Sequence, residues 1–258
     1  MTDFERTVRD AANLPIAGWD FKVLGDRWVR GEPPWDLRAI ARSAFQGSAT
    51  LVDLGTGGGE YLASLAPLPG RTVATEGYAP NLRIARARLA PLGVTVIPTG
   101  TDGRVDVPDA SVDTVFDRHE AFDPAEVFRI LRPGGTFVTQ QVGESNYSAL
   151  HRWFGTAPVP PVNHVASAGS LAEEVSRAGL RPVVTQEGRF PEWFRDVGAV
   201  IYFLRAAPWE VPGFTVERYR PQLRRLHETI ERDGPWALEA QRLLVVARRP
   251  GVSSDPPE

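Results

Sequence analysis

The 258-residue sequence contains no cysteine. This absence excludes disulfides, zinc-thiolate sites, iron–sulfur ligation and thiol nucleophiles. A chain that needs no oxidising surroundings suits a reducing compartment, and we therefore expect a cytoplasmic protein.

Long apolar runs are also missing, and we expect no secretory leader. The longest apolar run is "VGAVIYFL", Val197–Leu204, and a membrane-spanning helix needs about 20 such residues. The amino terminus "MTDFERTVRD" has no basic start followed by an apolar stretch. We predict a soluble protein with no membrane partner.

Lysine is nearly absent, because Lys22 is the only lysine among 29 basic residues. No Gly-Lys-Ser or Gly-Lys-Thr can follow a glycine loop, which excludes a phosphate-binding P-loop. The net charge of −3 provides no overall attraction for nucleic acid. The many arginines accompany high alanine, glycine and proline, so they are weak evidence for RNA binding.

Short apolar runs alternate with helical patterns from Leu51 onward, which predicts parallel strands joined by helices. The helical segments include 81–89, 123–135 with its Pro-Gly-Gly stop, 144–155 and 170–180, and Pro221 sets the start of another. The predicted strands are "TLVDL", "RTVAT", "VTVIP", "VDTVF", "GTFVTQQV" and, near the end, "RLLVVARR". The earlier segment with three tryptophans is too irregular for a strand and predicts a helical cover.

The stretch "LVDLGTGGGEYL" places a glycine-rich turn directly behind the first strand. Such a turn lets backbone N–H groups approach a ligand. The dinucleotide pattern G-x-G-x-x-G fails, because Glu60 stands where its third glycine belongs and would oppose a pyrophosphate. The pattern that fits is D-x-G-x-G-x-G, formed by Asp53, Gly55, Gly57 and Gly59.

This pattern resembles motif I of the class I S-adenosylmethionine-dependent methyltransferases. Three further segments in the expected order strengthen the resemblance: Glu76 after the second strand, the acidic stretch from Thr101, and "EVFRILRPGGTFVTQQ" with its Pro133–Gly135 turn. The resemblance implies that S-adenosyl-L-methionine is the cofactor. Asp53 would attract its ammonium group, Glu76 would accept its ribose hydroxyls, and either Thr101 or Asp102 would meet its adenine. The cofactor-binding residues that it implies are Asp53, Gly55, Thr56, Gly57, Glu76, Gly77, Tyr78, Thr101, Asp102, Asp117 and Arg118.

The same resemblance implies an α/β fold with a doubly wound, seven-stranded, mainly parallel sheet whose last strand is antiparallel. We expect three parts: a helical amino-terminal cover over residues 1–46, a methyltransferase domain over 47–249, and a disordered tail over 250–258.

The methyl acceptor is not encoded in a motif. The segment "DRHEAF" stands where methyltransferases of nucleic-acid amines carry [DNS]-P-P-[YFW], and the lack of cysteine excludes the two-cysteine route to pyrimidine carbon-5. We expect O- or N-methylation of a small organic acceptor. His119 is the candidate base, with Glu120 or Asp117 orienting it or raising its basicity.

Two alternatives remain open at this stage. An RNA methyltransferase would use the arginines of "ERYRPQLRRLHETIER" against phosphates, although acidic residues dilute that helix. A non-catalytic S-adenosylmethionine-binding protein would keep the loop and Glu76 without turnover. The acceptor atom and the oligomeric state are likewise left open.

Overall fold

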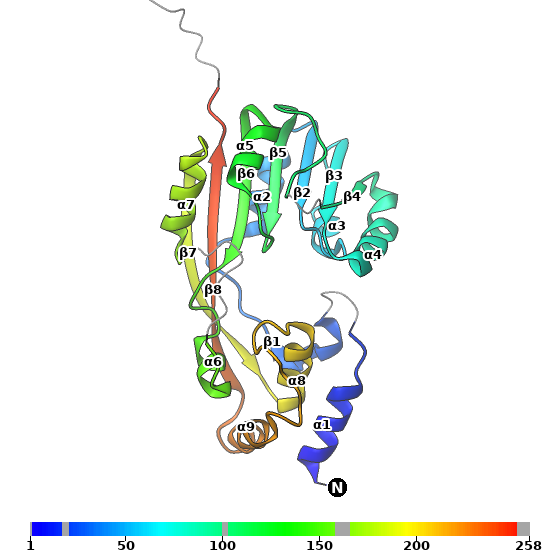
Figure 1. Cartoon of the computed structure of the whole chain (residues 1–258), viewed down its shortest axis with the longest axis vertical. Coiled ribbons are helices and arrows are strands. Elements are labelled where there is room, and N and C mark those ends of the chain that lie inside the picture. Colours follow the sequence, from blue (N-terminus) through cyan, green and yellow to red (C-terminus); the bar gives the residue numbers. More distant parts are fainter. Residues whose placement is uncertain (1, 17–20, 100–102, 158–165, 252–258) are drawn as a thin grey trace, which may run out of the picture. The chain divides into compact units, whose positions relative to one another are not determined.

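The computed structural model describes residues 2–16, 21–99, 103–157 and 166–251 (Figure 1). The chain divides into two compact units, each built from three separate segments. The sheet unit contains Trp35–Gly143, Pro161–Glu187 and Arg242–Glu258. The aromatic unit contains Met1–Pro34, Glu144–Pro160 and Gly188–Gln241.

Seven strands run through the sheet unit in the order β7-β8-β6-β5-β2-β3-β4. Neighbours from β6 to β4 are parallel, whereas β8 pairs with β6 in the antiparallel direction. The strands are β2 (Thr50–Leu54), β3 (Arg71–Glu76), β4 (Thr95–Pro98), β5 (Val112–Arg118), β6 (Leu131–Val142), β7 (Arg181–Phe194) and β8 (Trp236–Arg248). The predicted α/β class, the mainly parallel sheet and the antiparallel last strand are confirmed.

The predicted number of seven strands is wrong, because the described residues form eight. The additional strand is β1 (Trp28–Val29), which pairs antiparallel with Trp193 and Phe194 of β7 in the aromatic unit. It lies in the tryptophan-rich segment that was predicted to contain no strand. A two-residue strand has no alternation long enough to detect in sequence.

Helices cover both faces of the sheet in the sheet unit. Alternate residues of the central strands enter two different apolar clusters: Val52, Val115 and Phe137 in one, and Leu51, Phe116 and Val138 in the other. Because side chains of a strand alternate between faces, the two clusters mark the two faces. The helices of this unit are α2 (Leu37–Phe45), α3 (Glu60–Ser64), α4 (Ala79–Leu89), η2 (Ala90–Leu92), α5 (Pro124–Ile130) and α7 (Ala168–Arg177).

Local sequence explains where these helices begin. The Asp123 carboxylate accepts a hydrogen bond from the Ala125 N–H, and Pro124 occupies the first turn of α5, as the sequence predicts. In α2, the buried residues Leu37, Ala41 and Phe45 join the cluster that contains α4. Helix α2 therefore packs as part of the sheet unit.

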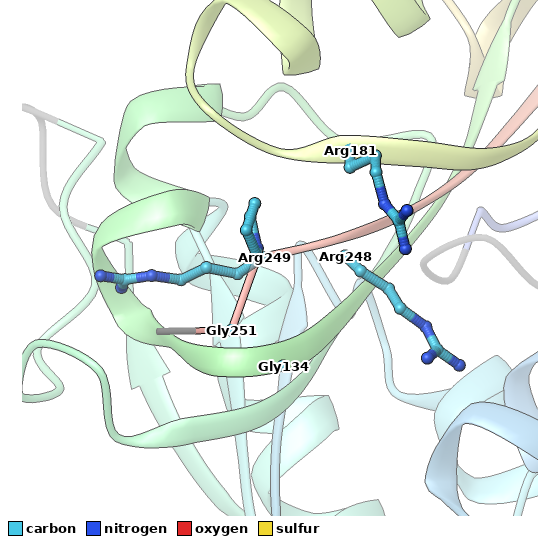
Figure 2. Close-up of a pocket in the computed structure, with 6 residues that line it drawn as sticks. Gly134, Arg181, Arg248, Arg249 and Gly251 are labelled. Atoms are coloured by element: carbon cyan, nitrogen blue, oxygen red, sulfur yellow. The ribbon is translucent and has the colours of Figure 1, made fainter. Parts of the chain in front are cut away.

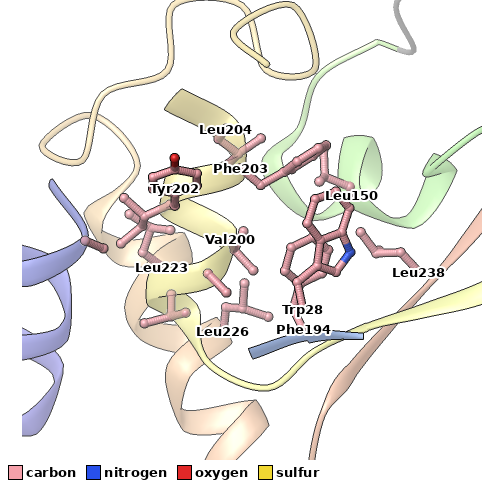
Figure 3. Close-up of a cluster of buried hydrophobic side chains, with 14 of the residues drawn as sticks. Trp28, Leu150, Phe194, Val200, Tyr202, Phe203, Leu204, Leu223, Leu226 and Leu238 are labelled. Atoms are coloured by element: carbon pink, nitrogen blue, oxygen red, sulfur yellow. The ribbon is translucent and has the colours of Figure 1, made fainter. Parts of the chain in front are cut away.

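The aromatic unit has its own apolar core (Figure 3). At its centre lies α8 (Val197–Ala206), whose residues 197–204 are all buried. The run "VGAVIYFL" is thus a buried core helix, around which Trp28 stacks on Phe194 with ring centroids 5.3 Å apart. The other helices here are α1 (Asp3–Asn13), η1 (Phe21–Arg27), α6 (Ser148–Phe154) and α9 (Arg220–Asp233), and Pro221 lies in the first turn of α9 as predicted.

The predicted boundaries at residues 46 and 249 stay predictions, as does the separate role of residues 1–46. Most of the predicted tail, residues 252–258, lies outside the described residues. No helix in the described part of the chain is both long and apolar enough to cross a membrane.

Candidate active site

The glycine loop joins the end of β2 to α3 through backbone conformations that favour glycine. Gly55, Gly57 and Gly59 have φ angles of 61°, 61° and 81°. Residues with a Cβ atom reach this region only at a cost of roughly 1–2 kcal/mol. The D-x-G-x-G-x-G spacing is therefore a requirement of the backbone as well as of any ligand.

Space imposes a second requirement at two of these glycines. A Cβ atom on Gly55 would lie 2.3 Å from Cγ of Glu120, and one on Gly59 would lie 2.8 Å from Cγ of Leu89. The Glu120 side chain consequently lies directly against the loop at Gly55. Glu120, in the turn after β5, and the loop after β2 thus lie together at the carboxyl ends of neighbouring strands.

Asp53 is a buried carboxyl group at the start of this loop, with only 4% of its surface exposed. Burial raises the pKa of Asp53 to about 7, although the Arg118 guanidinium favours the charged form. The nearby Thr56 hydroxyl also favours the charged form of Asp53. The Thr56 Oγ1 atom is itself buried and forms no hydrogen bond of normal geometry with the described residues. A buried polar oxygen of this kind calls for an explanation, and a ligand bound at the loop would supply one.

Glu76 ends β3 beside the loop and is 6% exposed. Its Oε1 accepts a hydrogen bond of 2.6 Å from the Tyr78 N–H, which holds the turn that contains Gly77. The Tyr78 ring is 64% exposed. Thr101 and Asp102, the candidates for adenine, lie outside the described residues.

Asp117 is fully buried, and three protein donors engage its carboxylate. Thr139 Oγ1 and Gln141 Nε2 donate to Oδ2 at 2.7 and 2.6 Å, and the Glu120 N–H donates to Oδ1 at 3.1 Å. Burial raises the pKa of Asp117 well above its usual value. These bonds tie Asp117 to β6 and to the turn after β5, an arrangement that suits holding Glu120 in place.

Arg118 lies over the face of Tyr61, with its guanidinium carbon 4.4 Å from the ring centroid. Tyr61 in turn stacks on Phe116 with an interplanar angle of 7°. The guanidinium is thereby fixed where it affects the pKa of Asp53. Sequence reasoning missed Tyr61, and the only available signal was its place just behind the glycine loop.

His119 occupies a strained backbone position, with a φ of 69°. Its ring Nε2 lies 3.1 Å from Gln140 Nε2, and Trp35 Nε1 donates to Gln140 Oε1 at 2.9 Å. Burial lowers the pKa of His119 well below its usual value, and the charges of Arg118 and Arg242 lower it further. Neither Glu120 nor Asp117 is among the causes of this shift, and the role of His119 as a base stays a prediction.

Glu120 has the opposite electrostatics. Burial raises the pKa of Glu120, and the negative charge of Glu76 raises it further. The raised pKa makes the Glu120 carboxylate a stronger proton acceptor than an ordinary glutamate. No group of three or more His, Asp or Glu residues within the described ranges could hold a metal ion.

A cavity of about 330 Å³ lies elsewhere in the sheet unit, lined by Gly134, Arg181, Arg248, Arg249, Pro250 and Gly251 (Figure 2). It adjoins the start of β6, whereas the glycine loop follows the end of β2, and both strands run parallel to β5. The cavity therefore lies at the opposite edge of the sheet from the glycine loop. Arg249 is also committed to backbone oxygens of Phe128 and Leu131.

Comparison with known proteins identifies the part of the chain that contains the glycine loop. Residues 52–139 match a family described as a methyltransferase domain, a range that runs from β2 to β6. This segment is a methyltransferase domain. The protein is therefore identified as a methyltransferase. A search of curated proteins by sequence returns no match.

Solved structures share the fold at low identity. A proposed methyltransferase from Bacillus halodurans C-125 is 19% identical, with a TM-score of 0.59 over 83% of this chain and 99% of its own. The YcgJ protein from Bacillus subtilis is 14% identical, with a TM-score of 0.56 over 83% and 98%. An S-adenosylmethionine-dependent methyltransferase from Aquifex aeolicus is 16% identical, with a TM-score of 0.50 over 96% and 100%.

The site residues fit the cofactor. S-adenosylmethionine presents an ammonium, a carboxylate, a ribose and a sulfonium-bound methyl group. Buried carboxyl groups at Asp53 and Glu76 match the cationic and hydroxyl parts, and the buried Thr56 oxygen offers a further polar contact. The backbone N–H groups of the glycine loop would donate hydrogen bonds to the carboxylate of S-adenosylmethionine.

Gly57→Ala should weaken S-adenosylmethionine binding about tenfold, the worth of one displaced hydrogen bond. The reason is that alanine resists the φ of 61° and shifts the loop N–H groups. Calorimetric titration measures the affinity. Gly93→Ala is the matched control, because Gly93 has a φ of 72° in open space. Equal affinity of Gly57→Ala and wild type would show that the loop does not contact the cofactor.

Proposed function

We propose that this enzyme methylates a small organic acceptor at an oxygen or nitrogen atom, with Glu120 as the proton acceptor. The observation that carries the proposal is the Glu120 carboxyl group, mostly buried against Gly55 and with a raised pKa. A base in that position lies beside the loop expected to hold the cofactor. The raised pKa of Glu120 brings it closer to the pKa of the acceptor group that loses the proton.

The remaining groups have positioning roles in this proposal. Bound S-adenosylmethionine supplies an activated methyl group on its sulfonium. Asp53 binds the ammonium group and Glu76 binds the ribose hydroxyls. Asp117 fixes the Glu120 backbone through the 3.1 Å bond from the Glu120 N–H. The chain thus aligns the reactants and removes the acceptor proton.

Helix α9 argues against RNA as the acceptor. Arg220 and Arg224 both form ion pairs with Glu5, and Arg232 pairs with Asp233 at 2.7 Å. Arginines already paired with carboxylates on their own unit present little net charge to phosphates. The face that an RNA methyltransferase would use is therefore largely neutralised.

A transfer assay with two arms tests the acceptor class. The protein is incubated with methyl-labelled S-adenosylmethionine and cell extract, with and without ribonuclease, and the products are separated by size. We expect label in the small-molecule fraction in both arms. Label in a macromolecular fraction that ribonuclease removes would overturn the proposal in favour of RNA.

Glu76→Gln should weaken cofactor binding by roughly 1.5–3 kcal/mol, the worth of a hydrogen bond to a charged group. The amide keeps the size of the side chain and loses the charge that favours two ribose donors. Isothermal titration at neutral pH provides the measurement. Glu173→Gln, an exposed change on α7, serves as the control. If the two variants bound equally well, the assignment of Glu76 to the ribose would be wrong.

A further inference from the structure

We propose that Trp35 and Gln140 are positioning residues that hold His119 as a neutral imidazole with its proton on Nδ1, so that His119 serves the reaction as a hydrogen-bond donor. The assignment of the His119 tautomer depends only on the hydrogen bonds that Trp35 and Gln140 form. The donor role toward the methyl acceptor rests on the proposed function.

The tautomer follows from one donor that cannot change its role. The indole Nε1 of Trp35 can only donate a hydrogen bond, and it lies 2.9 Å from Gln140 Oε1. This contact requires the amide oxygen of Gln140 to face Trp35. The amide Nε2 of Gln140 then faces His119, 3.1 Å from its ring Nε2.

The amide nitrogen carries two hydrogens and no lone pair for accepting a hydrogen bond. His119 Nε2 must therefore be the acceptor in this contact, and the proton of the neutral ring must lie on Nδ1. The ring has one lone pair in that state, and Gln140 occupies it. This is why Glu120, and not His119, is assigned as the base.

The backbone holds the ring in the same place. The His119 N–H donates to the Gln140 carbonyl oxygen at 2.8 Å, so Gln140 binds both the main chain and the side chain of His119. The φ of 69° at His119 is a conformation that persists only where its surroundings determine it. Strain of this kind collects at functional sites.

The surrounding charges keep the ring neutral, since Arg118 and Arg242 both disfavour a second proton. Among the described residues, Nδ1 of His119 has no hydrogen-bond partner. His119 as a whole residue keeps part of its surface exposed. A neutral N–H donor suits an acceptor molecule that carries a hydroxyl, carbonyl or carboxylate oxygen beside the methylated atom.

Nitrogen-15 NMR of histidine-labelled full-length protein tests the tautomer directly. The His119→Asn variant assigns the ring signals. We expect the His119 ring at pH 7 to be protonated on Nδ1 only. A ring protonated on Nε2, or on both nitrogens, would overturn the proposal, whatever the enzyme methylates.

Two variants test whether the hydrogen bonds from Trp35 through Gln140 to His119 set the tautomer, rather than the packing around the ring. We call this chain of hydrogen bonds the relay. Gln140→Glu replaces the donor with a carboxylate and should move the proton to Nε2, while Trp35→Phe should leave a mixture of tautomers because the amide is free to turn over. Trp153→Phe is the control, because Trp153 and its hydrogen-bond acceptor, the carbonyl oxygen of Gln222, both belong to the aromatic unit. Wild-type tautomer in folded Trp35→Phe and Gln140→Glu proteins would contradict the relay.

The kinetic arm tests the donor role. Gln140→Glu should lower kcat/KM for the acceptor about tenfold, the worth of one neutral hydrogen bond, with the cofactor Kd unchanged. A changed tautomer with unchanged kcat/KM would overturn the donor role and leave the proposed function standing. Failure to find any small acceptor would overturn the proposed function and leave the NMR result standing.

Discussion

Glu120→Gln should lower turnover by roughly 10²- to 10⁴-fold, which is the usual contribution of a positioned general base. The amide has nearly the size and shape of the carboxylate but cannot accept a proton, so cofactor affinity should change little. Glu120 lies against Gly55 and has a pKa raised by burial and by Glu76. Measuring kcat together with the cofactor Kd separates chemistry from binding.

The matched control is Glu60→Gln, which alters another glutamate at the glycine loop. Glu60 forms an ion pair with Arg88 and is not expected to contact the acceptor. Its variant should keep turnover within a few-fold of wild type. Turnover in Glu120→Gln equal to that of Glu60→Gln would remove Glu120 from the mechanism.

The pH dependence of kcat is a second test of Glu120 as the base. A base works in its deprotonated form, so kcat should rise with pH through the raised pKa of Glu120 and then level off. The Glu120→Gln variant should lose this rising limb. A limb that persists in the variant would belong to another group.

Asp53→Asn should stabilise the fold above pH 7 by an amount on the order of 4 kcal/mol, because the difference between the folded and unfolded pKa of the Asp53 carboxyl group is removed. The pKa of Asp53 is about 7 in the folded protein against a usual 3.8, so the folded state holds its proton more tightly than the unfolded state. Stability of the wild type consequently falls as pH rises from about 4 through about 7. Urea unfolding at several pH values measures the slope.

The same substitution should weaken S-adenosylmethionine binding by roughly 1.5–3 kcal/mol, because the charged partner of the ammonium group is lost. The expected pattern is therefore a more stable protein that binds its cofactor less tightly. Lower folding stability in exchange for tighter ligand binding is typical of a functional group that is held in an unfavourable environment. Lower stability together with unchanged affinity would refute this role of Asp53.

Asp113→Asn is a control of opposite sign. Burial acts to raise the pKa of Asp113, but hydrogen bonds from the Thr50 and Ala49 N–H groups outweigh it, and the pKa is lowered. The Asp113 carboxylate therefore contributes stability above its unfolded pKa that is lost as pH falls through its folded pKa. Its variant should be less stable than wild type at neutral pH and bind the cofactor normally.

The sequence by itself determined the alternating strands and helices and the place of the glycine loop behind β2, whereas the antiparallel last strand was expected only from the family resemblance. The alternation and the loop depend on residues that are close in the chain. Buried strands need continuous apolar runs, and the turn after β2 needs glycine at three alternate positions with positive φ. Local patterns of this kind are visible without any knowledge of packing.

Only the tertiary structure decided what the residues around the loop can do. The Trp35–Gln140 bond joins residues 105 positions apart, and no spacing rule predicts it. The pKa of His119 depends on burial and on Arg242 from β8, neither of which is visible from its neighbours in sequence. The physical reason is that desolvation and charge act through space, so the chemistry of a side chain depends on which distant segments surround it.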